Sequence, residues 1–348
     1  MRVGALAGAL AIALAIAGGA AGCGEESDPA VRSIALVTPG RGNDLDWSRH
    51  ARDAVEQISE ERRLTGHIAE DVTAEQIPGA FQQLSDRGSE FVFANDPSYA
   101  RAAARAAERT GVPTLVWGDP GALEPGLVGD VEVAASDGGF LAGALTAHAT
   151  GIKSVGILIA DDGTAWDSRN WNLMAGAYIA GARHEVPHVK IEVHWVGGPD
   201  GTTYEEMQAK GEELLDRRVQ TLFTLGGRSA LGVLRAVDKT IGEEEYAGVI
   251  GDKATVNTES DVVTSVLYDF DGLFRRAIRD LRTGRFGERP YRLTFENGGL
   301  RLLSTGRTPT DAYDAAMTAQ QELAEGAIEV PQTPTRADVL ALLRESPQ

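Results

Sequence analysis

Residues 40–47 (GRGNDLDW) combine glycines with polar and aromatic side chains between an apolar run and a helical pattern. The glycines allow a tight turn with exposed backbone N–H groups. Asn43 and Asp44 can form hydrogen bonds with a ligand, and Trp47 offers a flat face for stacking. The Gly-Lys-Ser/Thr ending of a phosphate-binding loop is missing. We expect contact with a small polar ligand, and a helix cap beside a packed tryptophan is the alternative.

Two further segments directly follow a strand pattern. Gly226 and Gly227 precede a helical pattern, where backbone N–H groups suit a close polar contact, although an ordinary tight turn is the alternative. Asp252 follows a short apolar run, and its carboxylate can accept hydrogen bonds from two hydroxyls or an amine. A helix-capping role for Asp252 is the alternative.

Other candidate ligand contacts are polar or aromatic residues near predicted strand or helix ends. Asn95 and Trp117 end strand patterns, and Trp171 lies near the start of a long helical pattern. A single tryptophan is more often a core residue, but several in these positions favour at least one that stacks on a planar ligand.

Strand and helix patterns alternate along most of the chain. The apolar runs are residues 33–38, 90–94, 113–117, 153–160, 189–196, 220–225 and 247–250, and the helical patterns are 47–63, 98–109, 166–183, 204–217, 229–239 and 270–283. This alternation predicts an α/β fold of two Rossmann-like lobes with parallel sheets. Ligands of parallel sheets bind outside the carboxyl ends of the strands, which places the expected site in the cleft between the lobes.

The predicted lobe boundaries follow from where the patterns change. Lobe one comprises residues 33–140 and 263–290, and lobe two comprises 141–262 and 291–331. Residues 332–348 form a C-terminal helical tail. Residues 139–150 and 262–267 are expected to link the lobes, and because no low-complexity spacer occurs, we expect hinged crossovers.

The N-terminus has the pattern of an export signal. One basic residue precedes an uncharged run that ends in small residues, which predicts a signal peptide over residues 1–22; an uncleaved anchor helix is the alternative. Cys23, the only cysteine, cannot form an internal disulfide. Its position resembles a bacterial lipobox, with Ala20 where leucine is usual, and implies that signal peptidase II cuts before Cys23 and that its sulfur receives a diacylglycerol. Residues 23–32 would tether the protein to the extracytoplasmic face of the cell membrane, unless Cys23 is an incidental thiol after an ordinary signal.

Composition and motifs exclude several functions. A formal net charge of −18 argues against nucleic-acid binding. No metalloprotease HExxH, CxxC or nucleophile-elbow motif occurs, and Pro187 interrupts the helical spacing of His184 and His188. We therefore expect no metal, no cofactor and no enzymatic activity.

Six segments in order resemble the basic membrane protein (Bmp) family of lipoproteins, which are type I periplasmic binding proteins of ABC transporters. They are residues 42–47 (GNDLDW), 137–143 (DGGFLAG, similar to the family's crossover), 221–232, 248–253, 263–266 (VTSV) and 326–331 (GAIEVP). The resemblance covers residues 33–331 and implies a small-molecule ligand and an ABC permease as partners.

The family includes purine-nucleoside receptors, and their site implies roles for residues of this chain. Asn43 and Asp44 would contact the ligand, Trp47 would stack on a base, Gly226 and Gly227 would approach by backbone, and Asp252 would hold sugar hydroxyls.

The chain departs from the nucleoside receptors at several positions. Tyr268, a further candidate ligand contact, replaces a lysine, Met174 replaces an aromatic residue one turn from Trp171, and Lys253 follows the strand-end Asp252 where a second Asp is common. Trp47 in the opening motif and the missing lysine look more like the Med-like regulators of the family. The leading hypothesis is a solute-binding component of an importer, the main alternative is an extracytoplasmic sensor without transport, and an enzyme on the same scaffold is the third.

Overall fold

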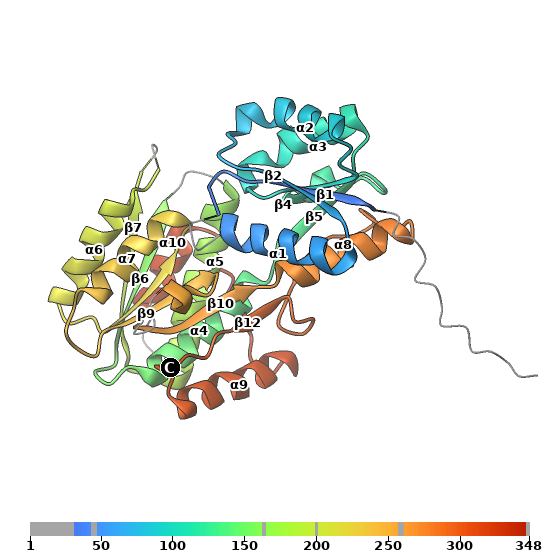
Figure 1. The fold of residues 1–348 in the computed structure, drawn as a ribbon. Helices are drawn as coiled ribbons and strands as arrows, with labels where there is room; N and C mark the ends of the chain where they lie inside the picture. Colours follow the sequence, from blue (N-terminus) through green and yellow to red (C-terminus); the bar gives the residue numbers. More distant parts are fainter. Residues whose placement is uncertain (1–30, 43–46, 162–164, 199–200, 257–260, 346–348) are drawn as a thin grey trace, which may run out of the picture.

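The computed structural model describes residues 31–42, 47–161, 165–198, 201–256 and 261–345. The described elements form two lobes, each built on a six-stranded sheet, that lie side by side (Figure 1). This confirms the predicted two-lobed α/β architecture.

Sheet A, the sheet of lobe one, is parallel throughout and has the strand order β11-β5-β4-β3-β1-β2. Its strands are β1 (Ser33–Val37), β2 (Thr65–Ala69), β3 (Phe91–Ala94), β4 (Thr114–Trp117), β5 (Val128–Val133) and β11 (Tyr291–Leu293). The helices of this lobe are α1 (Trp47–Arg62), α2 (Ile77–Asp86), α3 (Ala100–Thr110) and α8 (Phe270–Arg282). α2 packs against α3 on one face of the sheet and α1 packs against α8 on the other (Figure 1), so the inner strands are apolar on both faces.

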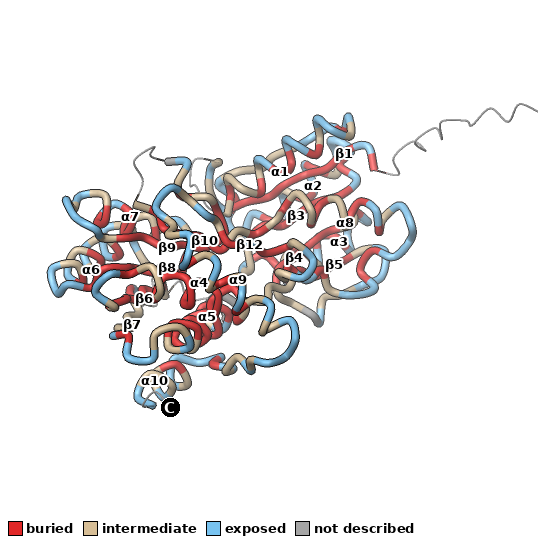
Figure 2. Tube along the Cα trace, turned by 90° about the horizontal axis from the view of Figure 1, so that it is seen from below, coloured by how far each residue is buried: buried red, intermediate tan, exposed pale blue. Residues whose placement is uncertain are grey.

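Sheet B, the sheet of lobe two, has the order β12-β10-β9-β8-β6-β7, and only the pairing of β12 with β10 is antiparallel among its described strands. Its strands are β6 (Ser154–Asp161), β7 (Lys190–Gly197), β8 (Thr221–Leu225), β9 (Glu245–Ile250), β10 (Val262–Tyr268) and β12 (Leu300–Leu302). The helices of this lobe are α4 (Ala135–Ala149), α5 (Ala165–Glu185), α6 (Tyr204–Asp216), α7 (Leu231–Asp238), α9 (Thr310–Ala324) and α10 (Arg336–Arg344). α6 and α7 cover one face, and the buried helices α4 and α5 cover the other (Figure 2).

The described chain passes between the lobes three times, and this corrects the predicted boundaries. The passages lie between β5 and α4, between β10 and α8, and between β11 and β12. Residues 139–150 are not a linker, because they lie within α4 of lobe two. Residues 263–268 belong to sheet B, where β10 is hydrogen-bonded on both sides, and β11 belongs to sheet A, where it pairs with β5.

The glycines of residues 137–143 serve the contact between α4 and α5. A Cβ on Gly139 would lie 2.1 Å from the carbonyl oxygen of Met174, and one on Gly143 would lie 2.2 Å from that of Tyr178. The two helix backbones therefore approach more closely than any side chain at these positions would allow. The motif that resembled a crossover is a helix-packing surface.

The predicted C-terminal tail contains α10, which packs against α5. Both terminal nitrogens of Arg183 donate hydrogen bonds to the carbonyl oxygens of Leu342 and Leu343, each over 2.8 Å. These carbonyls belong to the last turn of α10, where helix carbonyls lack partners within the helix.

Candidate functional site

Residues that follow the carboxyl ends of strands in the two sheets meet where the lobes face each other. Trp47 begins α1 shortly after β1, Gly227 follows β8, and Asp252 follows β9. The structure places Gly227 beside Trp47, and it joins Asp252 to His50 of α1. These candidate residues therefore gather at the boundary between the lobes, where strand direction predicted the ligand site.

The ring of Trp47 lies among aromatic side chains of both lobes. Its centroid is 4.8 Å from that of Trp117, with the planes at 81°, and 5.9 Å from that of Tyr268, with the planes at 82°. A Cβ on Gly227 would lie 3.6 Å from Cδ1 of Trp47, an ordinary van der Waals distance. Trp47 thus presents an aromatic edge to the backbone of the opposite lobe.

Asn95 holds the two tryptophans in place. Its Nδ2 donates to the carbonyl oxygen of Trp47 over 3.0 Å, and its Oδ1 accepts from Nε1 of Trp117 over 3.1 Å. The side chain is fully buried. Because both ends of the amide are used within lobe one, Asn95 positions the aromatic residues.

Asp252 lies on a strained bend at the end of β9. Ile250 has a φ of +73°, a left-handed conformation that is unfavourable for a β-branched residue. The backbone N–H of Asp252 donates to Nε2 of His50 over 3.2 Å. The side-chain Oδ1 of Asp252 accepts from the backbone N–H of Ala254 over 2.9 Å. The second bond is the capping role that we weighed for this residue, and the first brings the bend against lobe one.

The Gly226-Gly227 turn also has an unusual backbone. Gly226 has a φ of +148°, and a Cβ there would lie 2.5 Å from that of Ala160 on the neighbouring strand. A residue with a side chain would both strain the turn and clash with β6. The glycine therefore lets the turn cross the strand end closely enough for Gly227 to reach Trp47.

A buried carboxyl lies beside the first passage between the lobes. Asp130 on β5 has no exposed surface, and its Oδ1 accepts from the N–H of Asp119 over 2.9 Å. Burial raises the pKa of Asp130 to about 7, which that hydrogen bond partly opposes. Oδ2 has no hydrogen-bond partner within the described part of the chain. Asp130 is thus a group that titrates near neutral pH close to a hinge strand.

Comparison with known proteins identifies the family of this chain. A family model, described as ABC transporter substrate-binding protein PnrA-like (Bmp), matches residues 31–289. The chain belongs to this family. Its proteins are substrate-binding components of ABC systems, which bind small molecules and work with membrane permeases. No curated protein matches the sequence.

Solved structures share the fold at low sequence identity. An ABC transporter solute-binding protein from Conexibacter woesei has a TM-score of 0.71 and 19% identity, over 86% of this chain and 99% of that one. A second, from Aeropyrum pernix, has a TM-score of 0.65 and 17% identity, over 86% and 94%. A transcriptional activator of the comK gene from Bacillus halodurans has a TM-score of 0.67 and 15% identity, over 86% and 99%. These likenesses confirm the type I periplasmic-binding-protein fold.

Several predicted site residues of this Bmp-family chain are buried or lie outside the residues that the structure describes. Asn43, Asp44 and Cys23 are outside the described residues. Trp117 and Trp171 are each 1% exposed and Tyr268 is 4% exposed. Trp171 lies within the main core on α5. The structure thus brings Trp47, Trp117, Tyr268, Gly227 and Asp252 towards one region but does not present all of them on a surface.

Sequence reasoning missed His50 and Phe270. His50 lies one helical turn after Trp47, so a spacing of three residues could have placed both on one face of α1. Phe270 packs near Trp47, with ring centroids 6.2 Å apart, and follows Tyr268 by two residues.

Metal and membrane signals are absent from the described ranges. No group of three or more His, Cys, Asp or Glu side chains there could hold a metal ion. No helix within those ranges is both long and apolar enough to cross a membrane. The expectation that the chain is not an enzyme stays a prediction.

Proposed function

We propose that this Bmp-family chain is an extracytoplasmic lipoprotein that captures a small polar ligand between its lobes and delivers it to an ABC permease, with a nucleoside as the first candidate ligand. The observation that carries the proposal is the position of Trp47. Its ring belongs to lobe one, packs beside the Tyr268 ring of lobe two and faces the backbone of Gly227 in the same lobe. An aromatic ring at a lobe boundary can stack on a planar base when the lobes close around it.

A ligand that enters between the lobes can replace the contacts that Trp47 and Asp252 make across the boundary. In lobe two, Trp47 faces the Gly227 backbone and the edge-on ring of Tyr268, and the bond from Asp252 to His50 is a hydrogen bond between the lobes. A hinge opening would free the Trp47 ring and the Asp252 bend together. A base would then occupy the space between Trp47 and the glycine turn, and the Asp252 bend would face the sugar hydroxyls.

A thermal-shift screen with nucleosides, free bases, sugars and amino acids tests the ligand class. A ligand at about 100 times its dissociation constant stabilises the folded chain by about 2.7 kcal/mol, which is easily measured. We expect a nucleoside to raise the melting temperature. A shift produced only by another class would contradict the nucleoside assignment while leaving solute capture intact.

Trp47→Ala tests the site itself. We expect it to weaken binding of the identified ligand by about 5- to 150-fold, since base stacking contributes about 1–3 kcal/mol. The matched control is Trp195→Ala on β7, because Trp195 donates to Oδ1 of Asn172 over 3.1 Å and lies under Arg336 in lobe two. Equal loss in both variants, or none in Trp47→Ala, would overturn the proposed role of Trp47.

Lipidation at Cys23 is part of the proposal and rests on the sequence. In the natural host, the wild-type chain is expected in the detergent phase after phase separation of cell extracts, because attached acyl chains bind the membrane firmly. Radiolabelled palmitate supplied to the cells should label the wild-type chain but not Cys23→Ser. Equal labelling of the two chains would contradict lipidation at Cys23.

A second candidate function is an extracytoplasmic sensor without transport. The likeness to a protein described as a transcriptional activator favours considering it. Uptake of the radiolabelled ligand by cells that lack the gene separates the two. Lost uptake supports import, whereas normal uptake with altered gene expression supports sensing.

A further inference from the structure

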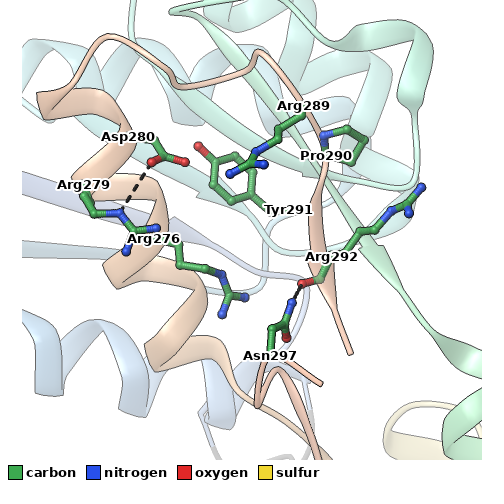
Figure 3. Close-up of a pocket in the computed structure, with 8 residues that line it drawn as sticks. All are labelled: Arg276, Arg279, Asp280, Arg289, Pro290, Tyr291, Arg292 and Asn297. Carbon is green, nitrogen blue, oxygen red and sulfur yellow. Dashed lines mark hydrogen bonds and ion pairs between the residues drawn. The ribbon is translucent and has the colours of Figure 1, made fainter. Parts of the chain in front are cut away.

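A cavity of about 460 Å³ lies in lobe one between α8 and β11, and it shares no lining residue with the site at the lobe boundary (Figure 3). Four arginines line it, Arg276, Arg279, Arg289 and Arg292, together with a single carboxylate, Asp280. The whole chain carries a formal charge of −18. The charge of the cavity lining is therefore opposite in sign to the net charge of the protein.

The arginines are only partly neutralised by neighbouring carboxylates. Nε of Arg279 is 3.6 Å from Oδ1 of Asp280, and Nε of Arg292 is 2.8 Å from Oε2 of Glu132. Figure 3 shows the Arg276 and Arg289 side chains at the cavity, extending from α8 and from the segment before β11. The lining thus keeps an excess of positive charge.

Arg276 is the most informative of these residues. Its Nη2 is buried and has no hydrogen-bond partner within the described ranges. Burial lowers the pKa of Arg276, and the carboxylate of Asp269 opposes this shift. A guanidinium that is partly buried and incompletely paired is unfavourable, so the negative charge of an anion in the cavity that Arg276 lines would stabilise it.

The number of arginines indicates the kind of anion. A guanidinium binds carboxylate and phosphate oxygens in pairs, and one carboxylate offers two oxygens. A phosphoryl group offers three or more oxygens and carries up to two charges, which suits several arginines at once. The volume is in the range of sites for small organic ligands, so it leaves room for the group that carries the phosphate.

We propose that this arginine pocket binds the phosphoryl group of an organic phosphate, supplied either by a soluble phosphate ester or by the headgroup of an anionic phospholipid. Tyr291, 6% exposed, lines the cavity and offers an aromatic wall beside the arginines. Asn297 also lines it and belongs to the passage between β11 and β12, where its Nδ2 donates to the carbonyl oxygen of Arg292 over 2.9 Å. The pocket therefore adjoins one of the connections between the lobes.

Calorimetric titration with glycerol 3-phosphate tests the soluble source, and cosedimentation tests the lipid source. The second assay uses residues 24–348, which lack both the predicted signal peptide and the cysteine proposed to carry acyl chains, because either could bind vesicles by itself. It compares vesicles of phosphatidylglycerol and phosphatidylcholine with vesicles of phosphatidylcholine alone. Binding of glycerol 3-phosphate supports a soluble ester, and binding to phosphatidylglycerol vesicles alone supports a headgroup. If the chain binds neither glycerol 3-phosphate nor the vesicles that contain phosphatidylglycerol, the proposal is overturned.

Substitutions identify the pocket as the binding site. Arg276→Gln and, separately, Arg289→Gln are expected to weaken binding at least tenfold. Arg289 is exposed, so its loss does not threaten folding. The matched control is Arg282→Gln, an exposed arginine at the end of α8 that does not line the cavity. Equal weakening by all three changes would show non-specific attraction and would also overturn the proposal.

Discussion

The backbone N–H of Asp252, in lobe two, donates a hydrogen bond to Nε2 of His50, in lobe one, over 3.2 Å. The bond requires a neutral imidazole whose Nε2 is the acceptor. Trp47 lies one turn earlier on α1 and faces the Gly227 backbone, so one turn of α1 meets two strand ends of the other lobe. The arrangement of the lobes in this structure therefore depends on identifiable neighbours that can be changed one at a time.

His50→Phe should favour the open arrangement. Phenylalanine keeps a ring near Phe270, whose centroid is 6.3 Å from that of His50, but offers no acceptor to Asp252. Loss of about 1 kcal/mol would shift the ratio of open to closed molecules about fivefold. Small-angle scattering of the ligand-free protein should show a larger radius of gyration. His188→Phe, at an exposed histidine, is the control, and identical scattering from both variants would contradict the role of His50.

The order of strands and helices could be predicted largely from the sequence, because buried parallel strands are continuous apolar runs. The places where prediction failed have physical causes. β2 is an edge strand whose residues are exposed or half-buried, so it has no apolar run. β10 has the pattern of a buried strand, but an apolar run does not reveal which sheet it joins.

The site could be predicted as far as strand direction determines it. The position of Trp47, Gly227 and Asp252 after strand ends was sufficient to bring them to the same boundary. Burial of Asn95 and Trp171 could not be predicted, because a residue's distance from a strand end does not say whether its side chain points inward. The arginine pocket was missed because its arginines are near in sequence but belong to no known motif.

Asn95→Ala should destabilise the protein and lower its affinity for the ligand. It would leave the carbonyl oxygen of Trp47 and Nε1 of Trp117 without the bonds that Asn95 makes. Loss of two buried hydrogen bonds is expected to lower the free energy of unfolding by about 2–4 kcal/mol. Urea denaturation measures this change. Trp117→Phe removes only one of the two bonds and should cost less, so an equal or greater loss in that variant would contradict the bridging role.

Asp130→Asn should change how stability depends on pH. The folded pKa of Asp130 is raised from 3.8 to about 7, so between these values the folded chain keeps a proton that the unfolded chain releases. Wild-type stability should therefore fall as pH rises through this window and level off above it. The difference is at most about 4 kcal/mol, because one pKa unit corresponds to about 1.4 kcal/mol.

Asparagine cannot release that proton, so the variant should lack this component of the slope. Denaturation at about pH 8 should show the variant to be more stable than the wild type, and at about pH 4 the two should converge. Parallel pH profiles for the two proteins would show that Asp130 does not titrate in this range.

Arg183→Ala should release α10 from α5. The guanidinium provides both bonds to the carbonyl oxygens of Leu342 and Leu343, and alanine provides none. The expected loss is about 1–3 kcal/mol of local stability, since charge-assisted bonds to helix ends are stronger than neutral ones. Amide hydrogen exchange in α10 should accelerate, while exchange in α6 on the far face of sheet B stays unchanged. Arg169→Ala, at an exposed arginine of the same α5 helix, is the control. Equal acceleration in that control would show a general effect of substitutions on α5 and would contradict the specific role of Arg183. Unchanged exchange in Arg183→Ala would mean that the Thr333 bond to the Asn172 carbonyl and apolar packing hold the tail without the arginine.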